Sequence, residues 1–190
     1  MRRPSVLLVV LASAFISWSA MADDTFIAYT NRTYLPVSFE YPAGWKAEPS
    51  SGSTESYTQV QVYAPDRPED GLRTYLVVRI VPPKERGGKY ASLGELVAAY
   101  RSTLLSTLEI TGQRQIVVLG APATLLELRG GLRLPWESKD PKFVPVKGQR
   151  VFLERDGRFY ELAWLTSIQR GPEIEQVFSH LLSSLTPYSS

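Results

Sequence analysis

Few residues in this sequence could carry out catalysis. The chain has one histidine, His180, and no cysteine among its 190 residues. A hydrolase triad needs a base that accepts a proton near neutral pH, most often histidine, and a zinc site needs several converging histidine, cysteine or carboxylate ligands. His180 falls at the flank of an apolar helical stripe, where we expect it to pack or to face solvent. We therefore predict no catalytic residues, no metal site and no cofactor. The expected protein is not an enzyme, and a hydrolase is a weaker alternative.

Two groups of acidic residues have possible chemical roles. Glu161 alternates with the apolar residues Phe159 and Ala163, and a carboxylate in such a setting could belong to a glycosidase pair. We favour a simpler explanation, an ion pair between Glu161 and an arginine on a neighbouring strand. A second acidic segment, residues 66–70, could offer oxygen ligands to calcium, but its spacing is not that of an EF-hand. A solvated acidic turn is the simpler interpretation of this segment.

The binding candidates lie in two predicted loops, residues 132–147 and 82–91. The first contains three prolines and shows no period, and long loops without secondary structure often carry function. Aromatic side chains among charges are typical of protein-contact surfaces. The candidate binding residues are Trp136, Lys139, Lys142 and Phe143 in the first loop and Lys84, Arg86 and Lys89 in the second. For Trp136, the alternative is that its ring folds back to cap the core.

Alternation of apolar and polar residues predicts the strands that must position these side chains. The predicted strands are 26–29, 37–41, 59–63, 73–81, 114–119, 123–129, 149–155 and 158–167, and residues 48–56 and 64–71 are predicted loops. Apolar spacing predicts helices at 93–108, behind the capping box SLGE, and at 172–185. Strand 73–81 is apolar on both sides, which indicates that both its faces are covered. We therefore expect an α+β fold, an α/β/α sandwich with a central, mainly antiparallel sheet of about six to seven strands and helices on both faces.

Residues 1–22 have the features of a signal peptide. Arg2 and Arg3 precede an apolar run over residues 6–16, and Ala20-Met21-Ala22 supplies small residues before a cleavage site after Ala22. Without the two leader arginines the 21 basic residues become 19, equal to the 19 acidic ones, so nothing indicates a nucleic-acid partner. We expect Sec-type export, a single domain over residues 23–190, and a periplasmic or secreted bacterial protein with no membrane span after cleavage.

Four segments carry a family resemblance. They are residues 37–45 (VSFEYPAGW), a strand that ends at Tyr-Pro and then Trp; 92–96 (SLGEL), a helix start; 120–123 (GAPA), a small-residue turn; and 178–184, the helix after the closing hairpin. In this order and spacing the chain resembles the Mog1/PsbP-like family over nearly all of residues 34–187. The resemblance implies an α/β/α sandwich and a binding protein rather than an enzyme. The chain lacks the cysteine of lipid-anchored cyanobacterial members and a histidine cluster for metal, so the resemblance does not extend to a photosystem role.

Two functions of different classes remain. The first is an exported, non-enzymatic binding or accessory protein that docks on a protein partner or envelope complex through residues 132–147 and 82–91. The alternative is a periplasmic carrier that holds a small apolar or anionic ligand between the sheet and a helix. An apolar cavity with a few inward polar groups would favour the carrier.

Overall fold

The computed structural model describes residues 25–51, 57–67, 72–135 and 139–188. The predicted signal peptide, residues 1–22, and Trp136 therefore lie outside the described residues. Seven strands form a large sheet in the order β3-β4-β5-β9-β8-β7-β6, with every neighbouring pair antiparallel. These strands are β3 (Lys46–Ser51), β4 (Thr58–Tyr63), β5 (Tyr75–Val81), β6 (Leu108–Val118), β7 (Ala121–Leu134), β8 (Lys142–Arg155) and β9 (Arg158–Ser167). The predicted α+β class and the mainly antiparallel central sheet are confirmed.

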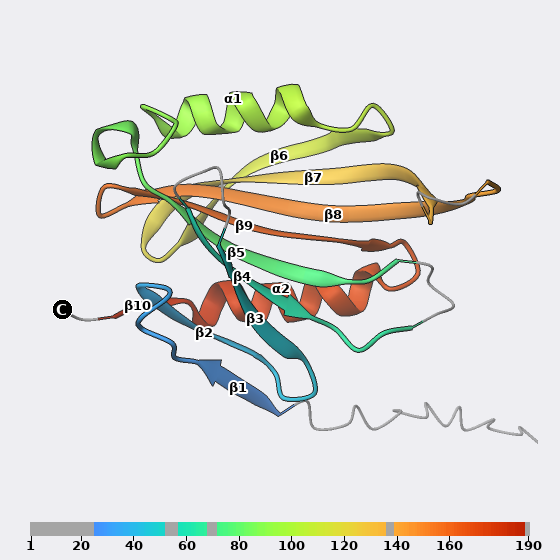
Figure 1. Ribbon diagram of the computed structural model, residues 1–190, viewed down its shortest axis with the longest axis horizontal. Helices are drawn as coiled ribbons and strands as arrows, with labels where there is room; N and C mark the ends of the chain where they lie inside the picture. The colour runs from blue at the N-terminus through green and yellow to red at the C-terminus, as the bar shows by residue number, and fades with distance from the viewer. Residues whose placement is uncertain (1–24, 52–56, 68–71, 136–138, 189–190) are drawn as a thin grey trace, which may run out of the picture.

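A smaller sheet and two helices complete the fold (Figure 1). The smaller sheet has the order β1-β2-β10. Its strands are β1 (Phe26–Tyr29), β2 (Val37–Pro42) and β10 (Thr186–Pro187), and the helical elements are η2 (Lys84–Arg86), α1 (Leu93–Thr103) and α2 (Gly171–Ser184). No helix in the described part of the chain has the length and hydropathy needed to cross a membrane.

Helix α2 packs on the larger of the hydrophobic clusters. Its apolar stripe, predicted from the sequence, is buried in the structure, and Ile174, Phe178 and Leu181 have no exposed surface. These side chains pack with residues of β2, β4, β5, β8 and β9, among them Val151 and Leu162. In the view of Figure 1, α2 lies below the large sheet and α1 above it.

Helix α1 packs on a smaller cluster made of the alternate residues of the same strands. Leu96 is the fully buried residue of α1, and it packs with Phe152 of β8 and Phe159 of β9. Because successive side chains of a strand point to opposite faces, Phe152 belongs to this cluster whereas its neighbours Val151 and Leu153 belong to the cluster under α2. The predicted burial of both sides of the central strands is therefore observed.

The start of α1 matches its prediction, but its end does not. Ser92 Oγ accepts a hydrogen bond from the Glu95 backbone N–H at 3.2 Å, as in a capping box. The Glu95 carboxylate accepts from the Ala91 N–H at 2.8 Å, one residue before the N-cap. The helix ends at Thr103 instead of Leu108, and Leu104 is extended, with φ −60° and ψ 133°. The Thr103 hydroxyl donates to helix carbonyls behind it, which competes with a further turn.

The predicted loop over residues 132–147 is wrong in its strand portions, because 132–134 are the end of β7 and 142–147 are the start of β8. The two strands pair from Ala123 with Leu153 to Leu134 with Lys142. A loop was predicted because this segment contains three prolines, and proline usually interrupts strands. The Pro145 carbonyl accepts a hydrogen bond from the Ile168 N–H at 3.1 Å, on the side of the strand that faces β9. Because the N–H and C=O of one residue point to the same side of a strand, an N–H at position 145 would also face β9. The strand therefore tolerates Pro145 without losing a bond between β7 and β8.

The predicted loop 48–56 is also partly wrong, because residues up to Ser51 belong to the edge strand β3. Its serine and glycine content suggested a loop. An edge strand also tolerates a proline such as Pro49 on its unpaired side. The predicted Asp156-Gly157 hairpin between β8 and β9 is confirmed. Both residues have positive φ, 52° and 62°, which is the conformation of a two-residue hairpin turn.

The packing of α2 can be tested by truncating its central aromatic ring. Phe178 is fully buried, and its ring meets the Trp164 ring edge-on with 6.4 Å between centroids. We expect Phe178→Ala to lower the free energy of unfolding by about 3–5 kcal/mol, because the substitution leaves a cavity. Urea unfolding measures the loss. The control, Phe143→Ala, removes the same ring at a site that is 63 % exposed and should cost less than about 1 kcal/mol. Equal losses would contradict this assignment of the core.

Candidate functional site

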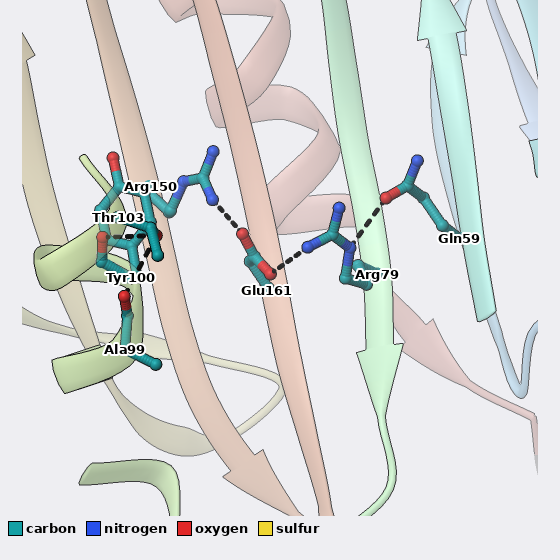
Figure 2. A network of polar contacts seen from close by, with 7 residues as sticks. All are labelled: Gln59, Arg79, Ala99, Tyr100, Thr103, Arg150 and Glu161. Atoms are coloured by element: carbon teal, nitrogen blue, oxygen red, sulfur yellow. Dashed lines mark hydrogen bonds and ion pairs between the residues drawn. The ribbon is translucent and has the colours of Figure 1, made fainter. Parts of the chain in front are cut away.

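A chain of polar contacts crosses the α1 side of the large sheet (Figure 2). Glu161 lies in the middle of β9 and is only 3 % exposed. Its Oε2 atom accepts from Nη1 of Arg79 on β5 at 3.0 Å, and its Oε1 atom accepts from Nη1 of Arg150 on β8. Nε of Arg79 donates in turn to Oε1 of Gln59 on β4 at 2.7 Å. These four residues, together with Tyr100, are called the Glu161 network below.

Aromatic rings cover both arginines of the network. The guanidinium carbon of Arg150 lies 4.1 Å from the centre of the Tyr100 ring, which α1 contributes. The guanidinium carbon of Arg79 lies 4.6 Å from the centre of the Tyr57 ring. A cation over an aromatic face is attracted by the negative charge of the ring's π-system. The rings therefore hold both guanidinium groups against the sheet.

The network carries one more positive charge than negative charge. Two guanidinium groups share a single carboxylate, and Nε of Arg150 is buried with no hydrogen-bond partner among the described residues. Burial raises the pKa of Tyr100 above its ordinary value of 10.0; Arg150 opposes this effect and Glu161 adds to it. The Tyr100 hydroxyl therefore stays protonated at neutral pH and does not balance the excess positive charge.

This arrangement suits binding better than acid–base catalysis. Both oxygens of Glu161 are occupied by arginines, so the carboxylate is held as an ion-pair partner. The predicted contact between Glu161 and an arginine on a neighbouring strand is confirmed, and there are two such arginines rather than one. In the described part of the chain, no group of three or more histidine, cysteine or acidic residues could hold a metal ion.

A cavity of about 220 Å³ lies beside the network, between the end of α1 and the sheet. Arg150 and Tyr100 contribute to its wall, and most of the remaining wall is apolar. Its lining residues are Tyr75, Val77, Tyr100, Thr103, Leu104, Leu105, Leu108, Leu128, Arg150, Ala163, Trp164 and Leu165. The network thus places one arginine at the edge of an otherwise mainly apolar space.

The structure places the two predicted binding segments at opposite ends of the sheet. Lys84 and Arg86 lie in η2, directly after β5, and Nη1 of Arg86 donates to the Asp156 carbonyl at the β8–β9 turn. Lys89 follows η2, with its Nζ atom 5.5 Å from the centre of the Tyr90 ring. Lys139, Lys142 and Phe143 lie instead at the turn between β7 and β8. The register of β8 and β9 sets these turns at opposite ends, because Arg155 pairs with Arg158 and Val146 with Ser167.

His180 has a structural environment, as the sequence suggested. Its Nε2 atom lies 2.7 Å from Oε2 of Glu40, and its ring stacks on Phe26 with 3.7 Å between centroids. The backbone N–H of Glu40 donates to Ser184 Oγ at 2.9 Å. These contacts join α2 to β1 and β2 at a partly exposed position, and they give His180 a role in packing.

Sequence reasoning missed Arg79, Arg150 and Gln59 as partners of Glu161. The signal that could have found Arg79 is its charge inside the apolar stretch YLVVRIV, which was predicted to be covered on both faces. Arg150 alternates with the apolar residue Phe152 in the same way. A cross-strand pairing depends on register, however, and a single sequence does not show which inward charges become neighbours.

The charge balance of the network can be tested with Glu161→Gln. This change keeps the shape of the side chain but leaves two guanidinium groups without a counter-charge. We expect the free energy of unfolding to fall by about 3 kcal/mol, the lower end of the range for breaking a buried pair. The lower end applies because the side chains of Arg79 and Arg150 are 27 % and 26 % exposed. Glu154→Gln, at an exposed position of β8, is the control and should change stability by less than about 0.5 kcal/mol. The free energy of unfolding of both variants is measured by chemical denaturation in low salt. Indistinguishable values for the two variants would refute the role of Glu161.

Several solved structures resemble this fold. The cyanobacterial PsbP protein CyanoP from Synechocystis sp. PCC 6803 aligns with a TM-score of 0.51 at 14 % identity, over 90 % of this chain and 98 % of CyanoP. The Ran-binding protein Mog1p from Saccharomyces cerevisiae aligns with a TM-score of 0.52 at 10 % identity, over 85 % of this chain and 94 % of Mog1p. LpqN, involved in cell envelope biogenesis of Mycobacterium tuberculosis, aligns with a TM-score of 0.50 at 14 % identity, over 80 % of this chain and 83 % of LpqN.

Sequence comparison adds no relative to this set, since no protein-family model and no curated protein matches the chain. At the identities given above, the similarity concerns the fold and not the activity. The alignment over most of each chain agrees with the resemblance seen in the sequence. The chain therefore has the Mog1/PsbP-like fold.

Proposed function

We propose that this chain is an exported binding protein that docks on a partner protein through the tip of the β7–β8 hairpin. The observation that carries the proposal is the length of these two strands. Pairing of β7 with β6 stops at Gly130, and pairing of β8 with β9 stops at Val146. The Gly131 N–H still donates to the Thr107 carbonyl, and the Pro145 carbonyl still accepts from the Ile168 N–H. Beyond these two residues β7 and β8 pair only with each other, as a two-stranded arm that projects from the large sheet (Figure 1). This arm, residues 131–135 and 139–145, is called the β7–β8 arm.

The β7–β8 arm presents a fixed aromatic ring among basic side chains. Phe143 is 63 % exposed, and its ring covers Gly131 so closely that a Cβ atom at Gly131 would lie 2.0 Å from it. The ring is thus held against the backbone before any partner arrives, and such preorganisation lowers the entropy lost on binding. Aromatic residues are enriched among the residues that dominate interface energies. Phe143 is therefore the proposed anchor of the interface.

The charges of the β7–β8 arm indicate what kind of surface would bind it. The basic residues Arg133, Lys139 and Lys142 are exposed, and Asp140 is the acidic residue in the described part of the arm. Complementary charge speeds association and disfavours wrong partners. The proposed partner is therefore a protein with an acidic surface around an apolar pocket that accepts Phe143. The basic residues of 82–91 lie at the other end of the sheet, so they are not part of this proposed interface, and a role for them stays a prediction.

Two further points support the proposal without testing it. Mog1p, which shares the fold, is a Ran-binding protein, so this fold can serve protein binding. The basic start, the apolar run and the Ala20-Met21-Ala22 site support export by the Sec route. We propose that the partner lies in the bacterial envelope, since an exported chain would meet its partner there.

Site-specific photo-crosslinking in the native host tests the docking surface. A crosslinking amino acid at position 143 should give a discrete crosslinked product, and the double change Arg133→Glu and Lys142→Glu should weaken that product at least severalfold, because complementary charge would become repulsion. Position 117 is the matched control, since Val117 is also an apolar strand residue and is 75 % exposed. Thermal unfolding should show that the double variant is folded. An equal product at both positions, or one indifferent to charge reversal, would remove the arm as the interface.

Export is tested by sequencing the N-terminus of the protein recovered from the envelope fraction. Cleavage after Ala22 would make Asp23 the first residue. Replacing Leu8 with arginine places a charge in the apolar run and should retain the uncleaved chain in the cytoplasm, because export needs that run to be apolar. The conservative change Leu8→Ile is the control and should be processed normally. A full-length chain in the cytoplasm of the unaltered strain would refute export.

A further inference from the structure

The Glu161 network and the cavity beside it form a second candidate binding site, which does not depend on docking through the β7–β8 arm. The guanidinium group of arginine can present two parallel N–H donors to a carboxylate along either of two edges. In Arg150, Nη1 already donates to Glu161. The edge formed by Nε and Nη2 is the other one, and Nε is buried without a partner among the described residues. Nε is covered by the protein, so the donors left for a ligand in the cavity that Arg150 lines are those of its Nη atoms.

The net positive charge of the Glu161 network favours an anionic hydrogen-bond acceptor over a neutral one. Arg79 and Arg150 together carry two positive charges, and Glu161 neutralises one of them. A neutral acceptor would leave this excess positive charge without a counter-charge, whereas an anion would supply one. Tyr100 keeps its proton at neutral pH because burial raises its pKa, so its hydroxyl does not repel an anion and can donate a hydrogen bond to one.

The rest of the cavity selects an apolar chain. Apart from Arg150, its wall is built largely from leucine side chains that follow α1 and from residues of β5, β7 and β9, among them Leu104, Leu108 and Leu128. Leu105, at the same wall, is 48 % exposed. The volume of about 220 Å³ lies below the range of roughly 300–1,000 Å³ for drug-sized ligands. It therefore limits the ligand to a small molecule and excludes a long-chain lipid from full burial.

We propose that the cavity beneath the end of α1 binds a small monocarboxylate with a short apolar chain. The carboxylate pairs with the Nη end of the Arg150 guanidinium group, and the chain lies among the leucines. Arg79 is a positioning residue in this arrangement. It shares Glu161 with Arg150 and so leaves Arg150 only partly neutralised. A carrier or sensor of short-chain carboxylates is the function that such a site would serve.

Hexanoate titrated into the purified protein tests the proposal, with binding followed by calorimetry and by amide chemical shifts. A ligand of this size should bind with a Kd of about 0.1–1 mM. Hexanol has the same chain without the charge, and acetate has the charge without the chain. Both should bind at least tenfold more weakly. Absence of saturable hexanoate binding in this range, or equal affinity for hexanol, would overturn the proposal.

Variants then locate the site. Arg150→Met should weaken hexanoate binding at least tenfold and leave the protein folded, because Glu161 keeps Arg79 as its counter-charge. Arg79→Met is the matched control. It also removes one charge from the network but keeps the Arg150 guanidinium group, so we expect a smaller loss. Equal losses in both variants would mean that net charge alone attracts the ligand, and would overturn the contact with Arg150.

A cavity-filling change gives an independent test that leaves every charge in place. Ala163 lines the cavity and is 3 % exposed, so Ala163→Leu puts three further carbon atoms into this space. We expect this variant to bind hexanoate at least tenfold more weakly than the unaltered protein. Its thermal unfolding curve reports whether the fold is kept, and Val117→Leu, at the exposed strand position, is the control that should bind normally. Undiminished binding by a folded Ala163→Leu protein would overturn this location of the site.

Discussion

The central strands β5, β9 and β8 must bury side chains on both faces, and the rest of the structure depends on this requirement. A chain without cysteine has no disulfides to supplement its core. Burial on two faces therefore has to hold the fold, and both faces need a cover. Val151 and Leu162 pack on the side of α2, and their strand neighbours Phe152 and Phe159 pack on the side of α1. One set of strands thus serves two clusters.

The two faces of the large sheet differ in composition: one is mainly apolar, and the other combines a small apolar cluster with a charged network. The cluster under α2 contains most of the fully buried side chains, including Phe178 and Leu181. The cluster under α1 is small, and the same side of the sheet carries Glu161 with two arginines. A charged network is a weak source of stability, because desolvation offsets much of the attraction between its charges. The α1 side can hold such a network, and a cavity next to it, because the α2 side supplies the apolar burial.

Sequence patterns predicted the parts of this fold that are set by local periodicity. Alternation located β5 and β9, helical spacing located α2, and Asp156-Gly157 located the last hairpin. The β7–β8 arm was missed because its prolines indicated a loop, although the N–H that Pro145 lacks would not have bonded β7. The ion pair of Glu161 was predicted, but its two partners were not, because they lie 82 and 11 residues away along the chain. The cavity depends on where α1 ends, and the apolar spacing continued past that end, to Leu108.

The proposed ligand cavity and the β7–β8 arm are neighbours in the structure. Leu132 and Leu134 of the arm form a third cluster with Val146 at its base, and Leu108 and Leu165 pack against this cluster. The same two leucines line the cavity beneath α1. Protein interiors are packed as densely as organic crystals, so a shift of a shared side chain is felt by both of its neighbours. A ligand that moved Leu108 or Leu165 would therefore change the support of the arm, and a partner that bent the arm would change the wall of the cavity. Thermodynamic linkage makes any such effect reciprocal. If the docked partner raises the affinity of the cavity for its ligand, the bound ligand raises the affinity of the arm for the partner by the same factor.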